Sequence, residues 1–164
     1  MTERKTANDN GAARKWPGIA IAPAATPEPD AFRFRGVETL RFADADMNGH
    51  VTQGVIASLC QNGRALLLAG PANALLPPGA RWVDRQLTLD FRHELVWPGT
   101  AEIGTAALRL GRSSIRFSQA VFQDGLCKAV AGSVMVLIDA RRRASMAIPE
   151  GLRERLGAMT GAAG

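Results

Sequence analysis

The fold is decided by residues 51–69, which read VTQGVIASLCQNGRALLLA. Apolar or small side chains return at every fourth position of this stretch: Val51, Val55, Leu59, Gly63 and Leu67. That period predicts an α-helix, which Gly70 and Pro71 end. Other apolar side chains, including Leu66, spread around the helix, so we expect it to be buried on most sides.

Segments on both sides of this helix have the pattern of β-strands. Residues 35–42 predict a short first strand, and residues 43–50 form a polar turn into the helix. After a loop over residues 72–80, residues 86–91 alternate between polar and apolar side chains, which indicates a half-buried strand. Three further strands are predicted over residues 100–110, 113–123 and 126–138.

The connections between these strands indicate the fold class. Asp124-Gly125 between the last two strands is typical of a type I′ hairpin turn, and Pro149 opens a short helix over residues 151–157. Connections this short exclude parallel pairing, so the strands after the helix should form a four-strand antiparallel meander. The class is α+β, with a sheet that curls around the helix to bury both.

The length of 164 residues suits a single domain. Residues 1–30 hold several prolines among alanine and polar residues, and we expect a flexible N-terminal extension there. Residues 31–157 then form the domain, and residues 158–164 form a C-terminal tail.

Composition narrows the choice of partner and compartment. The sequence has no apolar run long enough to span a membrane and no secretory signal, so we expect a cytoplasmic protein without a membrane partner. The 20 Lys and Arg residues exceed the 15 Asp and Glu residues, which favours an anionic partner. Tyr is absent and the arginines are scattered, which argues against nucleic acid and for a small phosphate-bearing substrate. Cys60 and Cys127 should be buried thiols.

Two stretches carry a family resemblance. Residues 41–51 read RFADADMNGHV, and a later set comprises LTLDF at 87–91, PGT at 98–100 and LRLGRSSI at 108–115. These sequence segments resemble those of the hot-dog thioesterases of the 4-hydroxybenzoyl-CoA thioesterase type. The resemblance spans roughly residues 34–138. It implies a hot-dog fold, in which an antiparallel sheet of about five strands wraps around a central helix.

The resemblance also implies roles for the turn before the helix. Asp46 would be the general base for water or the nucleophile, and a main-chain N–H at about Gln53 would polarise the thioester carbonyl. Plant acyl-carrier-protein thioesterases have a related D-x-N-x-H motif, which Asp46, Asn48 and His50 match. Asn48 and His50 are therefore catalytic candidates beside Asp46. The candidate substrate-binding residues are Gly49, Val51, Gln53 and Arg64.

Physical chemistry supports this site and also an alternative. A helix N-terminus offers unpaired N–H donors that stabilise a developing oxyanion. Gly49 gives the turn backbone freedom, while Asn48 and His50 can orient Asp46 or hold a water. However, Asp and Asn before a helix are also ordinary cap and turn residues, so on spacing alone a structural role stays open.

The sequence departs from the family pattern inside the helix. Where relatives have His-Val-Asn-Asn, residues 50–53 read His-Val-Thr-Gln, and Ile56 replaces the usual Tyr. Gln61 and Asn62 replace an acidic pair, which removes a possible second acid or water-holding group. We therefore expect an altered substrate pocket.

Other candidate residues are weaker. His93 follows a strand, where a surface histidine is the commoner interpretation. Residues 141–143 are three arginines, expected to be a solvated strand end, with contact to the phosphates of coenzyme A as the alternative. Ser113 and Ser114 have no His or Asp at triad spacing, which argues against a serine hydrolase.

The leading functional hypothesis is hydrolysis of an acyl-CoA or acyl-carrier-protein thioester, without a metal or other cofactor. The resemblance implies a homodimer or homotetramer in which two protomers pair their sheets and form the pocket between them. A non-catalytic acyl-thioester-binding protein is the first alternative. A hot-dog dehydratase is the second alternative, although the hydratase motif is not found in this sequence.

Overall fold

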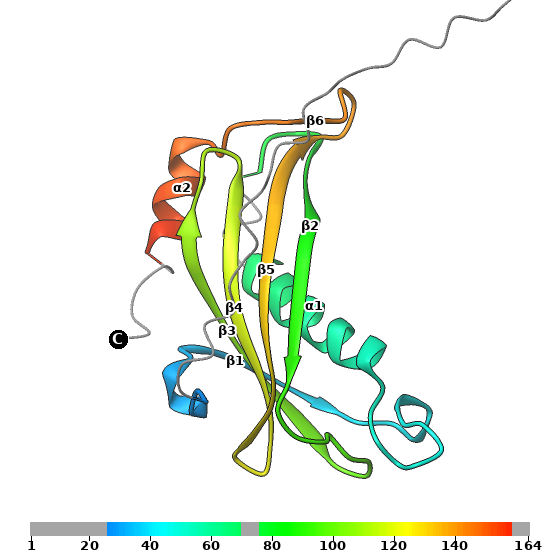
Figure 1. The fold of residues 1–164 in the computed structure, drawn as a ribbon. Coiled ribbons are helices and arrows are strands. Elements are labelled where there is room, and N and C mark those ends of the chain that lie inside the picture. The colour runs from blue at the N-terminus through cyan, green and yellow to red at the C-terminus, as the bar shows by residue number, and fades with distance from the viewer. Residues whose placement is uncertain (1–25, 70–75, 159–164) are drawn as a thin grey trace, which may run out of the picture.

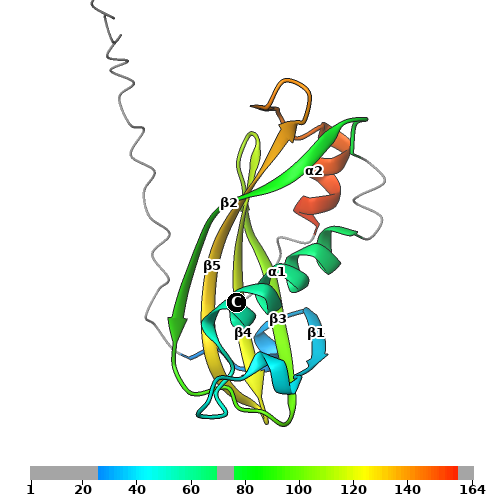
Figure 2. The same ribbon diagram turned by 90° about the vertical axis from the view of Figure 1, so that its right-hand side faces the viewer.

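The computed structural model describes residues 26–69 and 76–158. A curled antiparallel sheet dominates these residues, and a long helix lies along one of its faces (Figures 1 and 2). The strands are β1 Phe34–Thr39, β2 Ala80–Phe91, β3 Thr100–Leu110, β4 Ser114–Gln123, β5 Leu126–Asp139 and β6 Ala144–Ser145. The helices are η1 Pro29–Ala31, η2 Phe42–Asp44, α1 Gln53–Ala69 and α2 Glu150–Gly157, where η marks a 3-10 helix. The predicted α+β class is confirmed.

The strand order differs from the predicted meander. The strands follow the order β1-β3-β4-β5-β2, with β6 beside β5, so only β3, β4 and β5 form a meander. β2 pairs with β5 instead of β3, because residues 92–99 carry the chain across the end of the sheet. Gln123 holds this connection: its Oε1 accepts from Val96 N–H at 3.1 Å and its Nε2 donates to Val96 O at 2.7 Å. The prediction of a four-strand meander, in which β2 would neighbour β3, is therefore wrong.

Several local predictions are confirmed. The strands expected over residues 100–110, 113–123 and 126–138 are found with shifts of at most one residue at their ends. Asp124 and Gly125 have φ of 53° and 75°, as a type I′ turn requires. α2 begins directly after Pro149.

Two element boundaries near the start of the domain differ from the prediction. β1 ends at Thr39 rather than at residue 42, because Asp44 Oδ2 accepts the Arg41 N–H at 2.8 Å and folds the chain into η2. α1 begins at Gln53 rather than Val51, because the Val51 N–H donates to Leu95 O at 2.7 Å. Residues 1–25 of the expected extension lie outside the described residues, as do residues 159–164 of the expected tail.

α1 is buried on one side only. Its inner face joins the largest core clusters through Ile56, Leu59, Cys60, Leu67 and Leu68. On its outer face Leu66 is 55% exposed, so the expectation of burial on most sides is wrong for the single chain. The reason is geometric, because one sheet covers only one face of the helix.

A polar network is buried beneath α1. Arg64, whose side chain is 2% exposed, donates to Gln119 Oε1 at 2.8 Å and to Asp84 Oδ1 at 3.0 Å. Gln119 Nε2 donates in turn to Cys60 O and to Thr105 Oγ1. These bonds fix the helix over β4 and the edge strand β2, since leaving a buried charge unpaired costs several kcal/mol.

Both cysteines are buried free thiols, as predicted. Burial raises the pKa of the Cys60 thiol to about 11, so it is neutral at physiological pH. Cys60 and Cys127 therefore contribute to the core as small apolar side chains.

Gly63 lies so close to the polar network that no side chain fits at its position. A Cβ on Gly63 would lie 2.6 Å from Thr105 Oγ1 and 3.0 Å from Gln119 Nε2, inside the polar network. We expect Gly63→Ala to destabilise the fold by about 1–3 kcal/mol through overpacking. Gly54→Ala, on the same helix with open space around it, should instead stabilise by about 0.5–1 kcal/mol. Urea unfolding curves of both variants make the comparison, and equal effects would contradict it.

Candidate functional site

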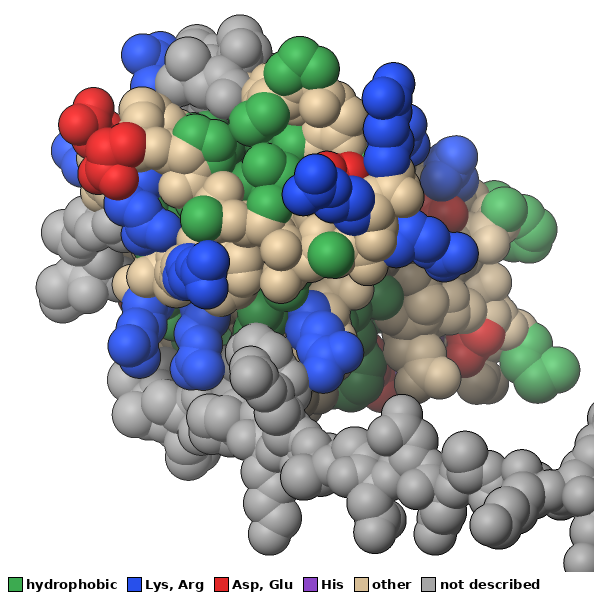
Figure 3. All heavy atoms as spheres, turned by 90° about the horizontal axis from the view of Figure 1, so that it is seen from above, with side chains coloured by type: hydrophobic (Ala, Val, Ile, Leu, Met, Phe, Trp, Pro, Cys, Tyr) green, Lys and Arg blue, Asp and Glu red, His purple; other side chains and the backbone are tan. Residues whose placement is uncertain are grey.

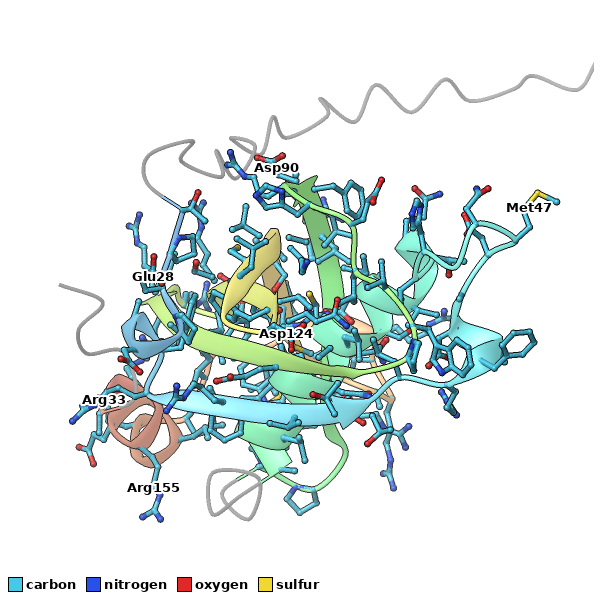
Figure 4. The ribbon with its side chains drawn as sticks, turned by 90° about the horizontal axis from the view of Figure 1, so that it is seen from below. Glu28, Arg33, Met47, Asp90, Asp124 and Arg155 are labelled. Carbon is cyan, nitrogen blue, oxygen red and sulfur yellow. The ribbon has the colours of Figure 1, made fainter. Side chains whose placement is uncertain are left out.

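The turn between η2 and α1 closes on itself through main-chain bonds. The Asp46 N–H donates to His50 O at 2.9 Å, and the Gly49 N–H donates to Asp46 O at 3.0 Å. Gly49 has a φ of 80°, a left-handed value that favours glycine. The main-chain N–H of Trp97, in the β2–β3 connection, also donates to Gly49 O at 3.2 Å and so stabilises the turn. Met47 lies at the tip of this turn and is almost fully exposed (Figure 4).

Asp46 is held by the turn that it belongs to. Its Oδ1 accepts the Asn48 N–H at 2.8 Å and the His50 N–H at 3.1 Å. The Asn48 side chain adds a longer contact of 3.4 Å to Oδ2. The Asn48 and His50 N–H groups lower the pKa of the exposed Asp46 carboxyl below its ordinary value. The group is therefore ionised at neutral pH, and Oδ2 is its more available oxygen.

The His50 side chain points toward a different acid. Its Nε2 lies 3.3 Å from Glu94 Oε2, in the connection after β2. Both residues line a cleft of about 390 Å³ at the N-terminal end of α1. The remaining lining comes from Val51, Gln53, Ile56, Phe91, Arg92, His93 and Leu95. Asp46 is in the same turn as His50 but is outside this lining.

The start of α1 leaves donors free at the cleft. The Val55 and Ile56 N–H groups both donate to Thr52 O. Within the described residues, the N–H groups of Gln53 and Gly54 have no acceptor. They lie at the positive end of the helix dipole, where a developing oxyanion is stabilised.

An apolar groove leads away from the same helix end. It lies between α1 and the edge strand β2, and it is lined by Gln53, Gly54, Ala57, Leu87, Leu89 and Phe91. Phe91 is 50% exposed, so the apolar face of β2 is only partly covered within one chain. The N-terminal end of α1 therefore offers hydrogen-bond donors, and the groove beside it offers an apolar channel.

Comparison with known proteins identifies the family. The model of the Thioesterase-like superfamily matches residues 40–156. The chain belongs to this superfamily. No curated protein matches the sequence at a significant level.

Solved structures share the fold. A thioesterase from Thermus thermophilus, complexed with coenzyme A and Zn, is 26% identical with a TM-score of 0.71, and the match covers 81% of this chain and 98% of that one. The PA5185 protein from Pseudomonas aeruginosa is 23% identical with a TM-score of 0.75, covering 84% and 99%. The SAV2348 protein from Staphylococcus aureus, in complex with CoA, is 12% identical with a TM-score of 0.72, covering 77% and 83%. The hot-dog fold of this thioesterase-like chain is thereby confirmed.

The structure brings most of the predicted site residues together. Asp46, Asn48, Gly49 and His50 share the turn, and Val51 and Gln53 follow at the cleft. Arg64 lies apart in the buried network with Gln119 and Asp84. Its expected part in substrate binding stays a prediction.

The sequence pattern does not reveal the contribution of the β2–β3 connection. Glu94 is not among the predicted site residues. His93, predicted to be a surface histidine, is indeed exposed, but it also lines the cleft. The only signal for Glu94 is an acid close to a strand end. Nothing in the sequence shows that this acid returns to His50.

Basic side chains gather at the other end of the sheet (Figure 3). The exposed members there are Arg81, Arg112, Arg141, Arg142 and Arg143. The expected solvated arginines at 141–143 are exposed, and Arg142 lies 3.9 Å from Asp139. β2 runs from this end to the cleft, roughly 40 Å at about 3.3 Å per residue. Within one chain, these arginines are therefore distant from the candidate site.

The described residues contain no candidate metal site and no candidate membrane-spanning helix. No group of three His, Cys, Asp or Glu side chains among them has an arrangement that could hold a metal ion. In the same part of the chain, no helix is long and apolar enough to cross a membrane.

The contacts of Asp46 predict its titration. The pKa of the Asp46 carboxyl, measured by ¹³C NMR of the folded chain, should lie below its ordinary value, because main-chain N–H groups stabilise its charged form. The carboxylate's contribution to the turn is therefore complete above the unfolded pKa and is lost as the pH falls through the folded one. Asn48→Ala should keep the midpoint low, since both main-chain donors remain. A midpoint at or above the ordinary value would disprove this account of the turn.

Proposed function

We propose that this chain hydrolyses acyl thioesters, with the carbonyl oxygen bound by the free N–H groups of Gln53 and Gly54. The observation that carries the proposal is the position of those donors: Gln53 lines both the cleft and the apolar groove, Gly54 lines the groove, and the preceding turn holds an ionised carboxylate. Two preorganised N–H donors stabilise the oxyanion of a tetrahedral intermediate. Asp46 is the candidate base for water, or the nucleophile, as in the 4-hydroxybenzoyl-CoA thioesterase type.

The surroundings of the cleft support an acyl-CoA or acyl-carrier-protein substrate. The groove lined by Leu87, Leu89 and Phe91 begins at the helix N-terminus, so an acyl group bound there has an apolar channel to occupy. The structures of the Thermus thermophilus thioesterase and the Staphylococcus aureus protein both contain coenzyme A. These features favour coenzyme A as the thiol carrier.

A non-catalytic acyl-thioester-binding protein is the second candidate. One observation favours it: Asp46 is outside the cleft lining, and its Oδ1 is engaged by its own turn. Binding and hydrolysis use the same donors and the same groove. Turnover separates the two candidates.

We further propose that two copies assemble through β2. This strand is an edge of the sheet, and its apolar side chains are only partly covered in one chain. A two-fold axis would pair the β2 strands antiparallel, which brings the Arg81 end of one copy beside the Phe91 end of the other. The basic end of each copy would then lie near the cleft of its partner, where phosphates of a carrier need positive charge.

The test of the catalytic proposal is Asp46→Asn. A panel of acyl-CoA thioesters is first screened by thiol release to find the best substrate. The variant should lose a hundred- to ten-thousand-fold in turnover, about the contribution of one general base. The amide keeps the size of the side chain, so unfolding curves of the same preparations should show that the fold survives. If the variant hydrolyses within about threefold of the parent, Asp46 is only a turn residue.

The test of assembly is light scattering at micromolar concentration. We expect the mass of a dimer or of a dimer of dimers, because assembly covers the apolar side chains of β2. A monomer with full hydrolytic activity would refute the pairing through β2 and leave the catalytic proposal intact.

A further inference from the structure

We propose that His50, oriented by Glu94, donates the proton that the departing thiolate takes up; this inference rests on the proposed thioester hydrolysis. It gives the two carboxylates near His50 separate tasks. Asp46 receives the proton of the attacking water, and Glu94 orients the imidazole that supplies a proton to sulfur. His50 is a catalytic residue in this scheme, and Glu94 is a positioning residue.

The geometry places His50 where a leaving group can reach it. Its ring lines the same cleft as Gln53, whose N–H we assign to the carbonyl oxygen. The Nε2 atom faces Glu94 Oε2 at 3.3 Å. Among the described residues, Nδ1 has no hydrogen-bond partner, so this nitrogen is free to contact a ligand.

The charges near His50 suit a proton donor. Glu94 approaches from the β2–β3 connection, and Asp46 lies in the same turn as His50 and accepts its main-chain N–H. Within the part of the chain that the structure describes, the only arginine in the lining is Arg92, whose guanidinium is paired with Asp90 at 2.8 Å. His93 is the remaining titratable group in the lining. The charged side chains that face His50 are therefore mainly carboxylates.

The steps balance in atoms and protons. Water adds to the carbonyl carbon while Asp46 takes one of its protons, and the oxyanion forms at the helix N–H groups. The C–S bond then breaks, and the thiolate receives the Nδ1 proton of the His50 imidazolium. Return of the proton from Asp46 to His50 restores the site. The products are the carboxylic acid and the thiol, with no other reactant.

The leaving group provides the test. An alkyl thiolate is a strong base and gains from protonation, whereas an aryl thiolate leaves readily without it. The experiment compares a coenzyme A thioester with the S-phenyl thioester of the same acyl group. His50→Gln should lower kcat/KM for the coenzyme A thioester about a hundredfold, and change the phenyl thioester by less than about threefold. Asp46→Asn should slow both, because both need water to be activated.

Glu94→Gln tests the positioning role. It should lower kcat/KM for the coenzyme A thioester about tenfold, and leave the phenyl thioester unchanged. A matched control is Glu154→Gln, the same chemical change on the exposed surface of α2, which should alter neither substrate. His93→Gln should change the two substrates by the same factor, since we assign it no proton transfer.

The outcomes separate the two proposals. If the parent chain hydrolyses no thioester, the proposed function is rejected, and the donor role is rejected with it. If the parent is active but His50→Gln slows both thioesters alike, or neither, the donor role alone is overturned. Should His50→Gln fail to fold, a Glu94→Gln variant that slows both thioesters alike, or neither, overturns the proposal by itself.

Discussion

Arg64 places a positive charge inside an apolar core, and this constraint determines how α1 lies on the sheet. Its guanidinium reaches Gln119 on β4 at 2.8 Å and Asp84 on β2 at 3.0 Å. Arg64 is buried although Asp84 is partly exposed, and an unpaired buried charge is costly, so the helix, the sheet centre and the edge strand must keep this relation. Gly63 allows it, because a side chain there would collide with Thr105 and Gln119.

The same constraint reaches the candidate site through the helix itself. Gln53 lies about 16 Å from Arg64 along the axis at 1.5 Å per residue, and a helix of this length transmits position with little bending. The preceding turn is fixed independently, by the Val51 N–H to Leu95 O and the Trp97 N–H to Gly49 O. The N–H donors at the start of α1 and the carboxylates of the candidate site are therefore positioned by different parts of the structure. Such preorganised groups stabilise developing charge without reorganising during reaction.

Local sequence patterns predicted the elements but not all of their neighbours. The four-residue period gave α1, and Asp124-Gly125 gave the hairpin, because both signals arise from nearby residues. The place of β2 beside β5 depends on how residues 92–99 cross the sheet, and no local signal records that path. The destination of Arg64 was missed for the same reason, since its partners lie on β2 and β4.

The same distinction between local patterns and contacts made by the fold applies to the candidate site. Asp46, Asn48 and His50 were found because one short turn contains them, whereas Glu94 belongs to a segment that only the folded sheet brings to His50. The two carboxylates consequently have different partners. Main-chain N–H groups hold Asp46 in its ionised form, while Glu94 faces an imidazole. Different surroundings allow two acids in one site to serve different steps, and here the fold rather than the motif creates that difference.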